Sequence, residues 1–235
     1  MQLFYNSEIT ENTKQFTFSK EESKHIVKVL RKKSGDIMHI TNGTGWFFSA
    51  KILSDNIKKC DAEITTKQFQ EQSKYRLHLA VAPTKMNDRY EWFLEKATEI
   101  GIQEITPIIC DHSERKVIKQ ERFEKILQSA MKQSLSCYLP KLNSAITFKD
   151  FINQDFKGDL FMAHCEETNK KSLKKVLKQN QNTTILIGPE GDFSTKEIEV
   201  AIAKEFIPVT LGETRLRTET AAIVACHSVA FVNEI

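Results

Sequence analysis

Residues 183–202, which read TTILIGPEGDFSTKEIEVAI, combine the patterns of a strand, a loop and a helix. Residues 183–187 form a short, largely apolar run that stops at Gly188, which is typical of a buried strand followed by a turn. Ser194 and Glu197 then have the spacing of a capping box, in front of apolar residues that recur with helical periodicity. A strand, a short loop and a capped helix in this order form the repeating unit of an α/β domain.

The same alternation continues on both sides of this stretch. Strands are also predicted over residues 77–82, 105–110, 160–163 and 207–211. Helices are predicted from near Asp88, with Glu91 at capping-box spacing, to Gly101, around residues 123–131 and 173–177, and from Glu219 onward. Strands that alternate with helices favour a mostly parallel sheet with helices on both faces.

The first 70 residues have a different pattern, with short segments rich in β-formers. Strands are predicted over residues 36–40, 46–53 and 58–66, the first two joined as a hairpin. One short helix is predicted after Ser19, which has capping-box spacing to Glu22. We therefore expect a small β-barrel over residues 1–70, a polar linker over residues 67–74 and an α/β domain over residues 75–235.

Composition indicates a soluble globular protein. Hydrophobic residues make up 40% and charged residues 28% of the 235 residues. No segment approaches the roughly 20 apolar residues that span a bilayer, and the first residues lack a signal peptide, so a cytoplasmic location is expected. The net charge of +3 does not decide whether a nucleic acid binds, because a single basic face is enough.

The cysteines and histidines predict neither a disulfide framework nor a metal site. The cysteines number five, which is odd, and no two of them have CxxC spacing. No HExxH motif is present, and the adjacent pairs His164-Cys165 and Cys226-His227 have poor geometry for binding one metal ion. We expect reduced thiols in or near the core.

A ligand site is expected where the strands of the α/β domain end, because ligands bind beyond the carboxyl ends of parallel strands. His164 follows one predicted strand, and Gly188 and Gly212 each follow another directly. Glycine allows a sharp turn or a close approach of the backbone to a ligand. Turn formation alone explains one such glycine, but two of them beside charged residues favour a ligand site.

Common nucleotide and hydrolase motifs are missing. The chain has no GxGxxG and no GxxxxGK[ST] motif, which argues against a dinucleotide-dependent oxidoreductase. Residues 113–116 fit SxxK, but no other acyl-serine motif accompanies them, which argues against a serine hydrolase.

Two long motifs resemble a known family. Residues 187–194 with Glu197, and residues 211–212 with 216–221, closely resemble the signature of the RsmE family. These are uridine N3-methyltransferases of small-subunit ribosomal RNA that belong to the SPOUT class. Supporting motifs occur in the expected order at residues 25–31 with 35–36, 96–101, 113–115, and 133–134 with 139–140.

The resemblance implies a fold, a cofactor and partners. It implies a PUA-like barrel that helps hold RNA, followed by a SPOUT domain with a C-terminal trefoil knot, which is a rare exception to normal chain topology. It implies S-adenosylmethionine as the methyl donor, with no metal and no membrane. The implied partners are 16S rRNA in the small ribosomal subunit and a second copy of the chain in a homodimer.

The resemblance also implies which residues bind the cofactor. Backbone groups near Gly188, Gly191 and Gly212 would bind it, and Leu211 and Leu216 would hold the adenine between apolar surfaces. The whole implied set is Met162, His164, Ile187, Gly188, Gly191, Leu211, Gly212, Leu216 and Thr220.

Arg217, Glu219 and Glu190 are the candidate catalytic residues. Arg217 would stabilise negative charge that develops on the base oxygens, although an ion pair within the knot would also explain it. Glu219 and Glu190 are candidate bases, and Glu219 could equally stabilise the start of the last helix. Candidate phosphate contacts, each of which could also be a solvated surface charge, are Lys28, Arg31, Lys85, Arg89 and Arg115.

Some positions depart from the family pattern. Residues 133–136 read Gln-Ser-Leu-Ser where Gln-Ser-Gly-Arg is common, and Gln2 and Leu3 stand near the start in place of an arginine. Both changes remove cations that could contact RNA. The alternatives are a non-catalytic RNA-binding assembly factor and a SPOUT enzyme that acts on transfer RNA.

Overall fold

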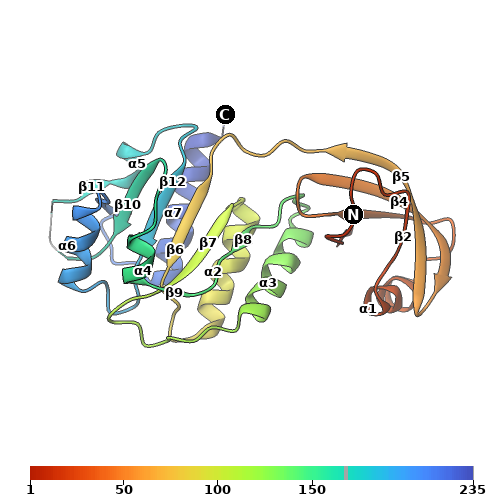
Figure 1. Ribbon diagram of the computed structural model, residues 1–235, viewed down its shortest axis with the longest axis horizontal. Coiled ribbons are helices and arrows are strands. Elements are labelled where there is room, and N and C mark those ends of the chain that lie inside the picture. The colour runs from red at the N-terminus through yellow and green to blue at the C-terminus, as the bar shows by residue number, and fades with distance from the viewer. Residues whose placement is uncertain (167–168, 235) are drawn as a thin grey trace. The chain divides into compact units, whose positions relative to one another are not determined.

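A computed structural model describes residues 1–166 and 169–234 of the chain (Figure 1). The chain divides into two compact units. The first comprises Met1–Gln72 and Met131–Leu139, and the second comprises Ser73–Ala130 and Pro140–Ile235. No helix within the described residues has both the length and the apolar character needed to cross a bilayer.

The first unit is built on a five-stranded sheet in the order β1-β3-β4-β5-β2. Its strands are β1 (Leu3–Tyr5), β2 (Gln15–Thr17), β3 (Ile37–Thr41), β4 (Trp46–Asn56) and β5 (Lys59–Phe69). β1 pairs with β3 in parallel, whereas the other neighbours are antiparallel. Buried apolar residues such as Ile26, Ile40 and Phe48 form its core.

The structure confirms three predicted strands of this unit and corrects the linker. The hairpin of β3 and β4 is present, and β5 continues to Phe69. Residues 67–69 are therefore strand rather than linker. β1 and β2 were not predicted, because three residues are too few to establish a period.

The predicted helix of the first unit has two parts. In α1 (Lys20–Lys24), the Ser19 hydroxyl accepts a hydrogen bond from the Glu22 backbone N–H at 3.2 Å, which confirms the cap. A π-helical turn, His25–Val29, follows directly, and the backbone of Arg31 then has a φ of 55°.

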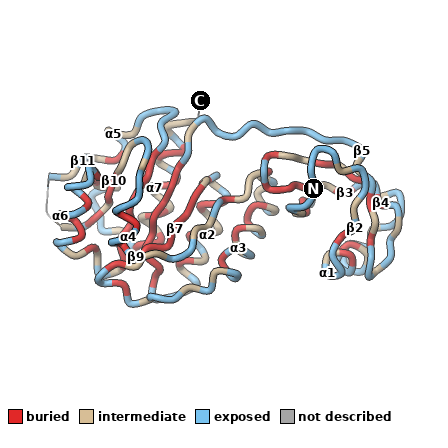
Figure 2. Tube along the Cα trace, viewed as in Figure 1, coloured by how far each residue is buried: buried red, intermediate tan, exposed pale blue. Residues whose placement is uncertain are grey.

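The second unit contains a parallel sheet in the order β11-β13-β10-β12-β6-β7-β8, with β9 also paired to β7. Every pair in it is parallel, which confirms the prediction from the alternating pattern. The strands are β6 (Leu77–Val81), β7 (Glu104–Ile109), β8 (Lys141–Leu142), β9 (Ile146–Thr147), β10 (Asp159–Ala163), β11 (Lys171–Ser172), β12 (Thr183–Ile187) and β13 (Ile207–Thr210). The central strands β6 and β12 are buried along their whole length (Figure 2).

Helices cover both faces of this sheet. The helices that follow β6 in the chain are α2 (Asn87–Ile100), α3 (Gln120–Gln133), α4 (Phe148–Ile152), α5 (Leu173–Val176), α6 (Thr195–Ala203) and α7 (Thr218–Asn233). Leu186 of β12 belongs to a cluster with Phe151 of α4 and Ile198 of α6. Its neighbours Ile185 and Ile187 point to the opposite face, and α7 contacts β6 and β12.

Two predicted helix starts have different outcomes. At α6, Ser194 and Glu197 form the complete capping box that their spacing predicts. At α2, the helix begins at Asn87 after Met86, which makes no side-chain cap. Glu91 pairs with Arg122 at 2.6 Å instead, so the capping box predicted at Asp88 was wrong.

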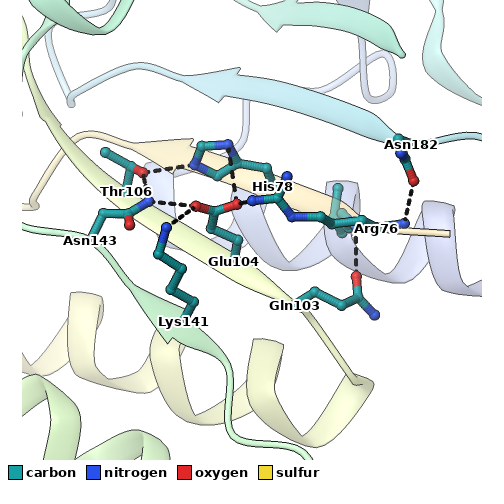
Figure 3. Close-up of polar contacts among 9 residues, drawn as sticks. Arg76, His78, Gln103, Glu104, Thr106, Lys141, Asn143 and Asn182 are labelled. Atoms are coloured by element: carbon teal, nitrogen blue, oxygen red, sulfur yellow. Dashed lines mark hydrogen bonds and ion pairs between the residues drawn. The ribbon is translucent and has the colours of Figure 1, made fainter. Parts of the chain in front are cut away.

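A buried polar cluster joins the amino ends of the strands in the second unit (Figure 3). The Glu104 carboxylate is only 5% exposed and pairs with the guanidinium of Arg76 and, at 3.3 Å, with Lys141. Asn143 donates to the same carboxylate at 2.8 Å. His78 lies 2.7 Å from the Thr106 hydroxyl. The cluster therefore lies at the opposite ends of the strands from the predicted ligand site.

Candidate active site

A cavity of about 630 Å³ opens where β10, β12 and β13 end. These three strands are neighbours in the sheet, with β10 in the middle, so the loops that follow them meet. The cavity walls come from residues 163–165, 187–190, 192 and 209–218, with Lys170 and Ala221 completing them. The volume is within the range of roughly 300–1,000 Å³ that holds ligands of drug size.

The backbone of the loop after β12 is closely packed at Gly188. A Cβ atom on Gly188 would lie 3.0 Å from the ring of Phe193, which is 2% exposed and belongs to the core. The Thr218 hydroxyl donates to the Gly188 carbonyl at 3.0 Å. This bond ties the loop to the first residue of α7 and fixes the backbone that faces the cavity.

The loop after β13 has an open backbone at Gly212. The Thr210 hydroxyl donates to the Gly212 carbonyl at 2.7 Å, and nothing lies within 4 Å of where a Cβ would stand. Leu211 and Leu216 line the cavity on either side of this segment. They provide apolar surface on either side of a polar turn, which suits an aromatic ring with polar edges.

His164 forms part of the wall after β10. It is 7% exposed, and burial, followed by the nearby charge of Lys170, lowers the pKa of its imidazole. The Lys170 ammonium donates to the His164 carbonyl at 3.1 Å. The imidazole is therefore neutral at pH 7. Within the described residues, no group of three or more metal-ligating side chains is arranged to hold a metal ion.

Six of the nine expected cofactor residues line the cavity, namely His164, Ile187, Gly188, Leu211, Gly212 and Leu216. Three others do not. Met162 is fully buried in the core, and Gly191 faces His112, whose Cβ would lie 3.1 Å from an added Cβ. Thr220 is half-buried in α7, one residue before Ala221, which does line the cavity.

The three candidate catalytic residues separate into two groups. Arg217 and Glu190 line the cavity. Glu219 does not, because its side chain is 7% exposed and lies 3.9 Å from the guanidinium of Arg89. Glu190 accepts a hydrogen bond from the backbone N–H of Lys85 at 2.9 Å, which ties it to the loop before α2.

Three of the five expected RNA contacts lie close together in the second unit. Arg115 donates to the carbonyls of Thr84 and Lys85 at 3.0 and 2.6 Å, and the Lys85 ammonium pairs with Glu114 at 2.8 Å. Lys85 contacts Glu190 through its backbone N–H, and Arg89 lies 3.9 Å from Glu219. The other two, Lys28 and Arg31, are exposed in the first unit.

Several cavity residues were not singled out from the sequence. Asp192 and Arg215 lie in the loops after β12 and β13, and Thr218 begins the helix that follows the second loop, so their place after a strand was the available signal. Lys170 had no such signal, because it precedes β11, which has only two residues.

Comparisons with known proteins identify the class and then the family. A family model described as an RNA methyltransferase domain matches residues 71–230, and one described as an RNA methyltransferase PUA domain matches residues 18–65. The protein is thus an RNA methyltransferase with an N-terminal PUA domain. A ribosomal RNA small subunit methyltransferase E from Buchnera aphidicola is 34% identical to it and covers 90% of this chain and 86% of the relative. The chain belongs to this ribosomal RNA small subunit methyltransferase E family, which confirms the resemblance.

Solved structures agree with this assignment. A probable rRNA-methyltransferase from Porphyromonas gingivalis is 39% identical and superimposes with a TM-score of 0.92, covering 99% of this chain and 98% of the other. A methyltransferase from Legionella pneumophila, solved with bound S-adenosylmethionine, is 26% identical with a TM-score of 0.88, covering 98% and 97% of the two chains. The predicted fold class, a PUA-like unit followed by a parallel α/β methyltransferase unit, is confirmed.

Proposed function

We propose that this protein transfers the methyl group of S-adenosylmethionine to N3 of a uridine in 16S rRNA. The observation that carries the proposal is the cavity beyond β10, β12 and β13, with Arg217 and Glu190 in its wall. The Legionella relative of similar fold was solved with the same cofactor, and the Buchnera relative is named for the small-subunit rRNA.

The cavity residues fit this cofactor by their chemistry. Leu211 and Leu216 would hold the adenine between apolar side chains, while backbone groups near Gly188 and Gly212 meet its polar edges. Bound here, the cofactor supplies an already activated methyl group, so the protein mainly has to align donor and acceptor.

Arg217 and Glu190 then have complementary roles in the proposal. Uridine N3 carries a proton that must leave as the new N–CH₃ bond forms. Glu190 is the carboxylate in the cavity wall that was expected to accept a proton, and we assign it this role. Arg217 stabilises the negative charge that the base oxygens gain when the proton leaves.

Glu219 has a structural role at the start of α7 in this proposal. Its buried carboxylate lies in the first turn of α7 and 3.9 Å from Arg89. A negative charge at that position interacts favourably with the helix dipole, and the pairing with Arg89 fixes the start of α7 next to Arg217.

The RNA partner would be held by cations of both units. Lys85 contacts Glu190 through its backbone, Arg115 donates to the Lys85 carbonyl, Arg89 lies in the α2 helix that follows, and Lys28 and Arg31 are exposed on the PUA unit. Phosphate contacts of this kind orient RNA without reading its sequence. A cytoplasmic location follows from this substrate.

The proposal includes a homodimer and a trefoil knot, as the family resemblance implies. The end of α7 presents Phe231, which is 67% exposed and stacks on His227 with ring centroids 6.0 Å apart. A large apolar side chain exposed on the last helix is compatible with a partner covering it. Sedimentation of the purified protein as a dimer would support this part.

Purified protein, small ribosomal subunits lacking the modification and S-adenosylmethionine test the reaction directly. Nucleoside mass spectrometry should detect 3-methyluridine, and calorimetry should detect cofactor binding. A non-catalytic assembly factor would instead bind the subunit and leave the cofactor unbound. Methylation of a different atom would contradict the assignment to N3.

A further inference from the structure

Asp192 has an unusual backbone conformation in the wall of the cavity. Its φ is +63°, in the left-handed region that few residues other than glycine adopt, although aspartate and asparagine do so more readily than most. Its N–H donates to the Pro189 carbonyl at 2.9 Å, which closes a tight turn after Gly188. The positive φ alone would favour glycine at this position, so the aspartate side chain is expected to have a role of its own.

The Asp192 carboxylate connects two loops of the cavity. One of its oxygens, Oδ2, accepts a hydrogen bond from the backbone N–H of Cys165 at 2.7 Å. Cys165 belongs to the loop after β10, whereas Asp192 belongs to the loop after β12, and both line the cavity. A charged acceptor and a short distance make this a strong hydrogen bond.

His112 also binds this turn, through hydrogen bonds to its backbone carbonyls. Its Nδ1 lies 3.0 Å from the Gly191 carbonyl oxygen and 3.1 Å from that of Asp192, so Nδ1 must carry the hydrogen. His112 follows β7, and an added Cβ on Gly191 would lie only 3.1 Å from its Cβ, a tight contact. The turn is thus fixed to the loop after β7 through its backbone and to the loop after β10 through the Asp192 side chain.

We propose that Asp192 is a positioning residue that sets the spacing between the β10 and β12 walls of the cofactor cavity. The inference rests on the proposed function, since it assumes that S-adenosylmethionine occupies the cavity. A cavity wall that is already ordered loses less conformational entropy on binding than a mobile loop does. The hydrogen bond between Asp192 and Cys165 should therefore increase the affinity for the cofactor. When this hydrogen bond is removed, the rate of methyl transfer, which depends on Arg217 and Glu190, should change less than the cofactor affinity.

Two substitutions separate the hydrogen bond from the charge and from backbone strain. Asp192→Asn keeps an acceptor oxygen and a residue that tolerates a positive φ, but removes the charge. Asp192→Gly suits the backbone and removes the acceptor. Asp155→Gly, at an exposed loop position, is the matched control for exchanging an acidic residue for glycine. Calorimetry with S-adenosylmethionine gives the dissociation constant, and hydrogen exchange reports the Cys165 amide.

For Asp192→Gly we expect the dissociation constant to rise about tenfold or more and the Cys165 amide to exchange faster, with a much smaller change in kcat at saturating cofactor. Asp192→Asn keeps a weaker, neutral acceptor, so it should lose only about threefold to fivefold in affinity, less than Asp192→Gly, and keep the amide protected. Wild-type affinity in Asp192→Gly would overturn the inference, and so would equal losses in both variants, since charge rather than the hydrogen bond would then matter. If the wild-type protein itself bound no cofactor, the proposed function would fail instead.

Discussion

At the scale of single residues, Arg217 is central to the proposed reaction. It lines the cavity, lies just before the first residue of α7 and is exposed. A guanidinium in this place can face the base oxygens of a bound uridine, whereas the cofactor contacts are assigned to the loops around Gly188 and Gly212. Arg217 should therefore act on the reaction rather than on cofactor binding.

Replacing Arg217 tests this division. Arg217→Ala should lower kcat by roughly 100-fold or more, because stabilisation of the developing charge is lost, while the dissociation constant of S-adenosylmethionine stays nearly unchanged. Arg217→Lys keeps the positive charge but lacks the planar guanidinium group, so its kcat should lie between those of the wild type and Arg217→Ala. Lys196→Ala, on the exposed surface of α6, serves as the control. Unchanged turnover in Arg217→Ala would remove this residue from the mechanism.

The residues of the site were only partly predictable from the sequence. Gly188 and Gly212 follow apolar strands, and their place in the cavity could be expected from that pattern and the rule for parallel sheets. Met162 and Gly191 came from the family resemblance, and the structure places them in the core and against His112. Asp192 was missed because its hydrogen-bond partner is 27 residues away in the chain, a relationship that no local pattern carries.

At the scale of helices and strands, long periodic segments were predictable and short ones were not. β12 has the predicted bounds, and the capping box of α6 fixes its start at the predicted residue. The two-residue strands β8, β9 and β11 exist through pairing with longer neighbours, which leaves no signal in their own residues. The polar cluster around Glu104 was also hidden, because the sheet assembles it from separate strands.

His78 in this cluster makes the stability of the second unit dependent on pH. Its imidazole packs on Phe151, and burial, then Arg76 and Lys141, lowers its pKa from an ordinary value of about 6.5 to about 4, although Glu104 lies 3.8 Å away. The folded state therefore binds fewer protons than the unfolded state between these values. The stability that the neutral imidazole contributes is complete above pH 6.5 and is lost as the pH falls toward 4.

Urea unfolding at pH 7 and pH 5 tests this effect. The free energy of unfolding of the wild type should fall by about 2 kcal/mol more than that of His78→Gln, which lacks the titrating group. The variant is expected to be less stable at pH 7, because it loses packing against Phe151, but its slope with pH should be shallower. Parallel slopes for the two proteins would mean that His78 does not titrate as stated.

At the scale of the whole molecule, the net charge is only +3, although the five cations assigned to phosphate contacts include three that lie close together in the second unit. If the five assigned residues contact phosphates, RNA affinity should fall steeply with salt, by about 0.7 log units per contact for each tenfold rise in salt concentration. The double variant Lys28→Ala/Arg31→Ala should therefore reduce the slope by about 1.4 and weaken binding to every RNA tested. Filter binding at several salt concentrations measures it, with Lys196→Ala/Lys204→Ala on the surface near α6 as the matched control. An unchanged slope in the first variant would exclude these two cations from the RNA interface.

Mass spectrometry of 16S rRNA from cells with and without this gene tests the proposed methylation in the cell. One 3-methyluridine should disappear on deletion and return when the wild-type gene, but not the Arg217→Ala variant, is restored. If the rRNA of the deletion strain kept all its 3-methyluridine, or if the inactive variant restored the modification, the proposed reaction at this cavity would be wrong.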